Sequence, residues 1–320
     1  MALDVVALGE VLVDLVSQGT GDDGFPVLAG HPGGAPANFL AALSKFGAKT
    51  AFLGKVGDDV FGRMLLNALE RTGICTEGVV VSEEVFTTLA FVTLDDRGER
   101  SFSFARKPGA DTQLRFEELK LSLIDQAKVL HFGTLSLTDE PARTATRQAV
   151  DYARREGKWI SFDPNLRPAL WKSLEDAREA MQWGLRRADL VKISDEEVSF
   201  LFGLGPREGA EKICREWGAQ LVFVTCGADG CWYQNQKASG HVDSLAGICA
   251  VDTTGAGDIF GGSALYRILQ TKKAPAALTD GELREIARFA CASAGLSTTR
   301  AGGISSIFDY GEVEKALACR

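Results

Sequence analysis

Short apolar runs of strand length recur along the chain, and segments with helical periodicity separate most of them. The runs occupy residues 5–8, 50–55, 128–132, 159–162, 190–193 and 221–225. Because parallel strands need long crossover connections, this order predicts an α/β fold, a doubly wound and mainly parallel sheet with helices on both faces. No Pro-rich or Ser-rich linker divides the 320 residues, so we expect a single domain spanning residues 1–320.

One helical segment illustrates the local signals. Residues 58–72 begin with Asp58 or Asp59 as the N-terminal cap, and Leu65, Leu66 and Leu69 form an apolar stripe. Gly73 follows as a residue suited to the left-handed C-terminal stop. These signals predict a helix that packs on the sheet.

The pattern changes between residues 85 and 105, where two alternating strands flank the turn Asp95-Asp96-Arg97-Gly98 with no helix between them. Together with the segment near 12–30, we expect this hairpin to form a small β-sheet from residues of about 12–30 and 85–110. A sheet lying over the carboxyl ends of a parallel core would be a lid on a ligand cleft.

Charge and the N-terminal region limit the partners. The chain has 35 basic and 43 acidic side chains and a net charge of -8, which disfavours a nucleic-acid partner. The N-terminus lacks a basic region and is interrupted by Asp4, Glu10 and Asp14, which is unlike a signal peptide. The longest uncharged stretch, residues 24–44, contains three prolines. We therefore expect a cytoplasmic protein without a membrane partner.

The sharpest local signal is residues 252–258, Asp-Thr-Thr-Gly-Ala-Gly-Asp, directly before a helical pattern. The small residues Gly255, Ala256 and Gly257 leave backbone amides available at a helix N-terminus, where the helix dipole also favours an anion. Asp258 in the first turn would take a proton from an attacking hydroxyl while the amides stabilise a transferred phosphoryl group. The alternative is an Asp that only stabilises the helix start; the preceding threonines and Asp252 favour catalysis.

Two motifs resemble the signatures of one family. Residues 252–262, DTTGAGDIFGG, resemble the C-terminal signature of the PfkB, or ribokinase-like, carbohydrate kinases, and residues 33–38 and 54–62 resemble its N-terminal pattern. The resemblance covers nearly the whole chain. It implies ATP-dependent phosphorylation of a sugar hydroxyl with Mg²⁺, and a β lid that often forms a homodimer contact. It also implies a monovalent cation, such as potassium, near Asp252.

The sugar end is predicted from residues that follow the first strand and open the next helix. A sugar needs paired donors and acceptors, which Asp14 and Asn38 supply, and Gly33 and Gly34 let the backbone approach the ring. Taken alone, Asp14 is a typical surface residue and Asn38 a typical helix cap, but the resemblance places sugar contacts at these positions. Arg106 is a further candidate for a sugar hydroxyl, with an ion pair to an acid on the lid as the alternative.

The nucleotide end is predicted from three other segments. The resemblance makes the segment with Thr225, Gly227 and Gly230 an ATP loop, and we expect further nucleotide contacts from Asn165, Arg167 and Lys192. Spacing alone favours a glycine hairpin turn for Thr225, Gly227 and Gly230. The fork of Arg167 suits phosphate or carboxylate oxygens, with an exposed salt bridge as the alternative. Lys192 is either a phosphate partner or a surface lysine.

The metal-binding pattern of the family is altered here. Many relatives have Asn-x-x-Glu, but the matching stretch has Ser194 in the Asn position and retains Glu197. We therefore expect Glu197 to act on Mg²⁺ through water molecules rather than as a direct ligand. Ser194 and Glu197 also form a potential capping box, and both interpretations are compatible.

The substrate prediction follows the resemblance further. Residues 33–39, 101–111 and 160–171 resemble the fructokinases of the family more than its ribokinases, so we expect phosphorylation of the 6-hydroxyl of fructose. The 2-keto-3-deoxygluconate kinases are the rival, because Arg106 or Arg167 could pair with a sugar-acid carboxylate. A dinucleotide-dependent dehydrogenase is disfavoured, since no G-x-G-x-x-G follows the first strand. A non-catalytic nucleotide or sugar sensor on the same scaffold is the alternative from another class.

Overall fold

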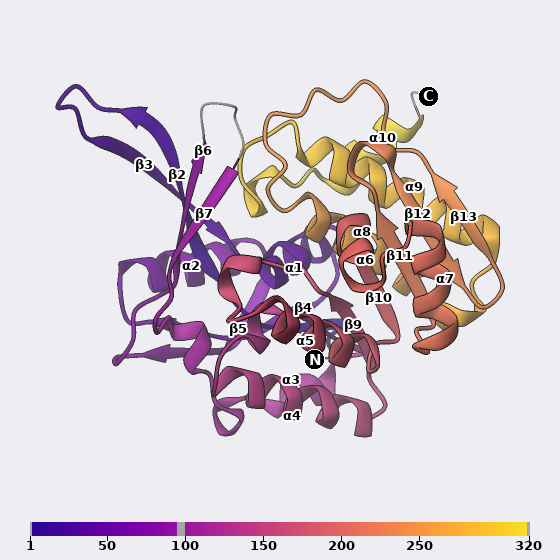
Figure 1. The fold of residues 1–320 in the computed structure, drawn as a ribbon, viewed down its shortest axis with the longest axis horizontal. Helices are drawn as coiled ribbons and strands as arrows, with labels where there is room; N and C mark the ends of the chain where they lie inside the picture. The colour runs from indigo at the N-terminus through magenta and orange to yellow at the C-terminus, as the bar shows by residue number, and fades with distance from the viewer. Residues whose placement is uncertain (1, 95–99, 319–320) are drawn as a thin grey trace.

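The computed structural model describes residues 2–94 and 100–318, which form two β-sheets and ten α-helices (Figure 1). The larger sheet has nine strands in the order β13-β12-β11-β10-β9-β8-β1-β4-β5. These strands are β1 (Val5–Leu8), β4 (Thr50–Gly57), β5 (Ile74–Ser82), β8 (Val129–Gly133), β9 (Trp159–Asp163), β10 (Leu190–Ser194), β11 (Leu221–Thr225), β12 (Cys231–Asn235) and β13 (Ser239–Val242). Only the β11–β12 and β12–β13 pairs are antiparallel, so the predicted mainly parallel sheet is confirmed.

Helices cover both faces of this sheet and bury two apolar clusters against it. One face carries α1 (Ala35–Lys45), α2 (Val60–Arg71), α8 (Ala256–Thr271), α9 (Asp280–Ser297) and α10 (Tyr310–Ala318). The other face carries α3 (Leu121–Gln126), α4 (Ala142–Arg155), α5 (Leu174–Leu185), α6 (Asp195–Phe202) and α7 (Pro206–Glu216). Within residues 2–94 and 100–318, no helix combines the length and the apolar character needed to cross a membrane.

The local predictions hold with small shifts at the ends. Each of the six predicted apolar runs lies in a strand of the large sheet, and β1, β4 and β8 are buried along their whole length because helices cover both faces. For α2, Asp59 is the cap, and its carboxylate accepts hydrogen bonds from the amides of Phe61 and Gly62. Leu65 and Leu69 are fully buried, whereas Leu66 is only partly so.

The second sheet has four strands in the order β3-β2-β6-β7. They are β2 (Leu12–Thr20), β3 (Pro26–Gly33), β6 (Leu89–Leu94) and β7 (Arg100–Ala105). The β6–β7 hairpin pairs antiparallel as predicted, while its turn at residues 95–98 lies outside the described residues. The far end of the β2–β3 ribbon projects away from the helices (Figure 1). The expected small sheet therefore exists, and it joins the two predicted segments through parallel pairing of β2 with β6.

Candidate active site

A cavity of about 360 Å³ opens where the chain leaves the carboxyl ends of β1, β8 and β9. The central strand β1 lies between β4 and β8, so the chain order reverses at this point of the sheet, as at the ligand sites of other doubly wound folds. The lining residues, which we call the acidic cavity, are Glu10, Leu12, Asp14, Gly34, Ala35, Asn38, Phe104, Leu135, Asn165, Arg167, Thr253, Thr254, Gly255 and Asp258. The small sheet contributes Leu12, Asp14 and Phe104 to this wall.

A second cavity of about 420 Å³ lies on the other side of the α8 N-terminus. We call it the glycine-loop cavity, since Thr225, Gly227 and Gly230 of the β11–β12 turn form part of its wall. The loop at 244–250 and the small residues Ala294 and Gly295 of α9 form much of the rest. Backbone and small side chains dominate this wall, so a flat ring can enter without displacing large groups.

The first turn of α8 separates the two cavities. Thr253 lines both, Gly255 and Asp258 line the acidic cavity, and Ala256 and Gly257 line the glycine-loop cavity. Gly255 is the N-terminal cap with φ of +75°, a left-handed conformation that turns the chain into the helix and that residues with a Cβ rarely adopt. The amide of Ala256 donates to the carbonyl of Thr253, whereas the amides of Gly257 and Asp258 have no carbonyl one turn earlier within the helix and can bind an anion between the cavities.

Asp258 is 8% exposed and is fixed by Asn38, whose Nδ2 donates to Asp258 Oδ2 at 2.9 Å. Burial raises the pKa of Asp258, while the hydrogen bond from Asn38 and the charges of Lys192 and Arg167 oppose that rise. Asn38 Oδ1 is buried and accepts no hydrogen bond from any residue that the structure describes. A carboxylate with a raised pKa beside an unsatisfied acceptor is suited to receive a hydroxyl group and its proton.

The residues predicted to bind sugar divide between two places. Asp14, Gly34 and Asn38 line the acidic cavity. Gly33 lies directly behind that wall, where a Cβ would stand 2.1 Å from Asp14 Oδ2. Arg106 is not part of the lining.

Arg106 instead belongs to a buried ion pair that anchors the end of β7. Its Nε and Nη2 donate to Asp111 Oδ2 at 2.8 and 2.6 Å, and its Nη1 donates to Thr138 Oγ1 at 2.8 Å. Nη2 also donates to the carbonyl of Leu135. The ion-pair alternative therefore describes Arg106 in this structure, because its donors already face protein acceptors rather than the cavity.

The residues predicted to bind nucleotide occupy three places. Thr225, Gly227 and Gly230 line the glycine-loop cavity, whereas Asn165 and Arg167 line the acidic cavity. The hairpin interpretation of the glycine turn is also correct, since β11 and β12 pair antiparallel around it. Lys192 is largely buried behind the α8 N-terminus and pairs with Asp163. The six residues predicted to bind nucleotide are therefore not brought together in one cavity.

The two predicted metal-binding carboxylates both accept backbone hydrogen bonds. Glu197 and Ser194 form the expected capping box of α6, and Glu197 Oε1 also accepts from the amide of Leu166 at 2.7 Å. Asp252 Oδ1 accepts from the amide of Thr254 and its Oδ2 from the amide of Gly302. Both carboxylates therefore fix loops that surround the first turn of α8.

Glu10 is a cavity residue that sequence reasoning missed. It is 2% exposed, lines the acidic cavity, and its Oε1 accepts from the amide of Ala35 at 3.1 Å. Burial raises its pKa to about 7, and the charge of Arg106 opposes this rise. An acidic residue after a strand is too common a pattern to identify such a site, so the signal in the sequence was only its position after β1.

The raised pKa of Glu10 predicts a pH-dependent stability. The folded protein holds this proton up to a pH of about 7 and the unfolded chain only to about 4.5, so ionising Glu10 destabilises the fold as pH rises through that window. Glu10→Gln should therefore gain about 2 kcal/mol in unfolding free energy relative to the wild type between pH 5 and pH 8, measured by urea denaturation. Exposed Glu84→Gln is the control. Parallel stability curves for wild type and Glu10→Gln would contradict the prediction.

Two cavities that meet at a helix N-terminus, with a buried carboxylate on one side and the first-turn amides of the helix between them, define a phosphotransferase acting on a hydroxyl group. Residues 2–309 match the sequence model of the pfkB family carbohydrate kinases, and the chain belongs to this family. The family resemblance of the two sequence motifs is thereby confirmed.

Relatives and solved structures agree with the assignment. The chain is 41% identical over 318 residues to probable fructokinase-4 of Arabidopsis thaliana, covering 98% of this chain and 96% of that protein. The crystal structure of a Xylella fastidiosa fructokinase with bound ATP superposes with a TM-score of 0.91 at 31% identity, covering 99% of both chains. A double-mutant fructokinase of Vibrio cholerae O395, bound to fructose, ADP and a potassium ion, gives 0.86 at 29% identity over 99% of both chains.

Proposed function

We propose that this protein transfers the γ-phosphoryl group of ATP to the 6-hydroxyl of fructose. The observation that carries the proposal is the position of Asp258, on the wall of the acidic cavity and in the same helical turn as Ala256 and Gly257, which line the other cavity. The fructokinases among the relatives and solved structures support fructose as the acceptor.

The acidic cavity suits a neutral polyol. Asp14 offers carboxylate oxygens on the lid side, and Asn38 Oδ1 lacks a donor that a sugar hydroxyl would supply. Leu12, Phe104 and Leu135 give apolar surface for the C–H faces of the ring. We place fructose here, with its 6-hydroxyl directed at Asp258.

The reaction then follows from the geometry. Asp258 accepts the proton of the 6-hydroxyl as the oxygen forms a bond to the γ-phosphorus, and the bond between that phosphorus and the β–γ bridging oxygen breaks to release ADP. The first-turn amides of α8, including that of Gly257, stabilise the negative charge on the phosphoryl oxygens. ATP lies in the glycine-loop cavity with Thr225, Gly227 and Gly230 along it.

Two cations complete the proposed site. Bound with ATP, Mg²⁺ would neutralise charge on the β- and γ-phosphates. Both carboxylate oxygens of Glu197 already accept hydrogen bonds from backbone amides. Glu197 would therefore hold Mg²⁺ through bound water molecules rather than as a direct ligand. A monovalent cation would be held by the Asp252 carboxylate, whose oxygens already fix this loop by accepting from the amides of Thr254 and Gly302.

One observation favours a second substrate. Arg167 lines the acidic cavity, where its guanidinium could pair with the carboxylate of 2-keto-3-deoxygluconate. With fructose as substrate, Arg167 instead serves the phosphoryl group that arrives beside Asp258, since its charge already acts on that carboxyl group.

A substrate panel decides between these acceptors. Coupled ADP release should show kcat/KM for fructose more than about tenfold above that for 2-keto-3-deoxygluconate, a difference of about 1.4 kcal/mol in transition-state stabilisation. Phosphorus NMR of the product should identify the 6-phosphate, and EDTA should abolish turnover. If the wild type prefers 2-keto-3-deoxygluconate and Arg167→Ala loses that preference, the sugar acid and not fructose is the substrate. If no sugar is phosphorylated, a non-catalytic sensor is favoured.

We also propose that the lid joins two copies of the chain. Its β2–β3 ribbon exposes Phe25, Val27 and Leu28 at 69%, 47% and 40%, an apolar edge that a second copy would bury. Analytical ultracentrifugation should give twice the chain mass of 34.3 kDa for the wild type and a single-chain mass for Leu28→Glu. Exposed Val81→Glu, outside the lid sheet, is the control. Equal masses for the wild type and Leu28→Glu would exclude this contact.

A further inference from the structure

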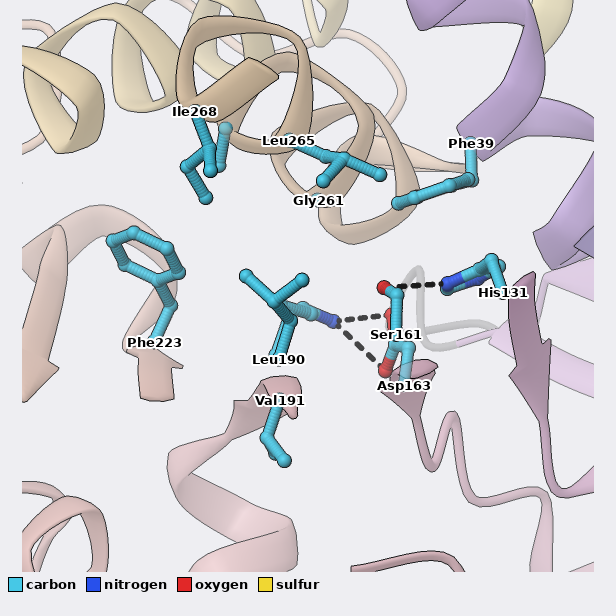
Figure 2. A pocket seen from close by; sticks show the side chains of 12 residues that line it. Phe39, His131, Ser161, Asp163, Leu190, Val191, Phe223, Gly261, Leu265 and Ile268 are labelled. Carbon is cyan, nitrogen blue, oxygen red and sulfur yellow. Dashed lines mark hydrogen bonds and ion pairs between the residues drawn. The ribbon is translucent and has the colours of Figure 1, made fainter. Parts of the chain in front are cut away.

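A buried ion pair lies behind the first turn of α8. Lys192 Nζ stands 3.1 Å from Asp163 Oδ2 and 3.3 Å from Oδ1, and the two side chains are 14% and 6% exposed. Figure 2 shows both contacts as dashed lines reaching Asp163 at the end of β9. A symmetric contact with both carboxylate oxygens restrains the ammonium group more than a single bond would.

The same ammonium group touches the helix that separates the cavities. A Cβ built on Gly257 would lie 2.8 Å from Lys192 Nζ, so Gly257 has no side chain where the lysine sits. Gly257 also lines the glycine-loop cavity. The ammonium group therefore lies beside Gly257, whose backbone amide is one of those proposed to bind the phosphoryl group.

We propose that Asp163 is a positioning residue, which holds the Lys192 ammonium group against Gly257 so that it contacts the phosphoryl group during transfer. The inference rests on the proposed function and deepens it. Neither Asp163 nor Lys192 is among the residues that line the two cavities, but the Lys192 ammonium group lies against Gly257, which does line the glycine-loop cavity. Asp163 can therefore act on the phosphoryl group only through Lys192.

The charges around Lys192 agree with this role. Burial by itself lowers the pKa of Lys192, but Asp163 on β9, Glu197 on α6 and Asp258 on α8 raise it above its ordinary value. His131 on β8 stays neutral, because burial lowers its pKa to about 3. Asp163 is the only one of these carboxylates within hydrogen-bond distance of Lys192 among the described residues.

A purely structural role is the competing explanation, and pH separates the two. Asp163→Asn keeps the shape of the side chain and removes its charge, so Lys192 should lose its proton at lower pH. Calorimetric ATP affinity without sugar should then fall at least tenfold between pH 7 and pH 9.5 in Asp163→Asn and less than threefold in the wild type. At pH 8, kcat with fructose should fall about 100-fold while KM for ATP changes less than threefold.

Two further variants make the result decisive. Ser161 lies on the same strand and is hydrogen-bonded to His131 (Figure 2), so Ser161→Ala should match the wild type within twofold in every measurement. In a Lys192→Gln background, Asp163→Asn should have less than a threefold effect on kcat, since its target is gone.

The opposite results would overturn the inference. The inference is wrong if the ATP affinity of Asp163→Asn changes with pH as that of the wild type does. It is also wrong if Asp163→Asn lowers kcat as much in the Lys192→Gln background as in the wild type. Equal losses in Ser161→Ala would reduce Asp163 to a packing role. If the wild type phosphorylates no sugar, the proposed function fails, and the ATP titration still decides the role of Asp163.

Discussion

Asp258→Asn should lower kcat by about 10²- to 10⁴-fold while ATP affinity and thermal stability stay near wild type. The amide cannot take a proton from the 6-hydroxyl, but its oxygen can still accept from Asn38 Nδ2 as the carboxylate does at 2.9 Å. Burial that raises the pKa of Asp258 also removes it from solvent, so a water molecule is not expected to replace it efficiently. Steady-state kinetics with saturating fructose and ATP gives the measurement.

The competing explanation assigns Asp258 only to the helix dipole, and the chain provides a matched control. Glu208 occupies the same third position of α7 as Asp258 does in α8, and it is exposed and outside both cavities. Glu208→Gln should lose a few tenths of a kcal/mol of stability and no activity. If Asp258→Asn behaves like Glu208→Gln, with kcat near wild type, Asp258 is not the base.

Arg106→Ala should destabilise the fold by about 3 to 5 kcal/mol, because it leaves the Asp111 carboxylate buried without its partner. The side chains of Arg106 and Asp111 are 3% and 2% exposed, and the same arginine also holds Thr138 and the carbonyl of Leu135. The free energy of unfolding in urea, measured at low temperature, tests this.

A double variant keeps the prediction informative if Arg106→Ala does not fold. Arg106→Met with Asp111→Leu removes both charges and should recover most of the lost stability. An Arg106→Ala protein of wild-type stability whose KM for fructose rises tenfold would show instead that the arginine serves the sugar, as the sequence alone predicted.

The fold was predictable because its signals are local. Apolar runs that are covered on both faces give uninterrupted strands, and the change to alternation after residue 85 marks the separate sheet. The ends of α2 differ from the prediction by one or two residues, since both Asp58 and Asp59 are plausible caps and only the folded turn selects Asp59.

The site was predictable only in part. The turn from Gly255 to Asp258 is one continuous segment, so its chemistry follows from the chain itself. Arg106 and Lys192 were harder, because Asp111 and Asp163 are equally plausible as surface acids until the strands pair. Arg167 lies on the acidic side because β9 ends next to β8, a neighbour relation that no short motif encodes.

The single helical turn between the cavities also bears on stereochemistry. Thr253 borders both sides, so an oxygen entering from one and an oxygen leaving from the other approach the phosphorus from opposite directions. A displacement of that kind inverts the configuration at the phosphorus. When the acceptor attacks ATP directly, there is one such displacement in each turnover. ATP made chiral at its γ-phosphorus with oxygen isotopes and sulfur should consequently yield a sugar phosphate of inverted configuration.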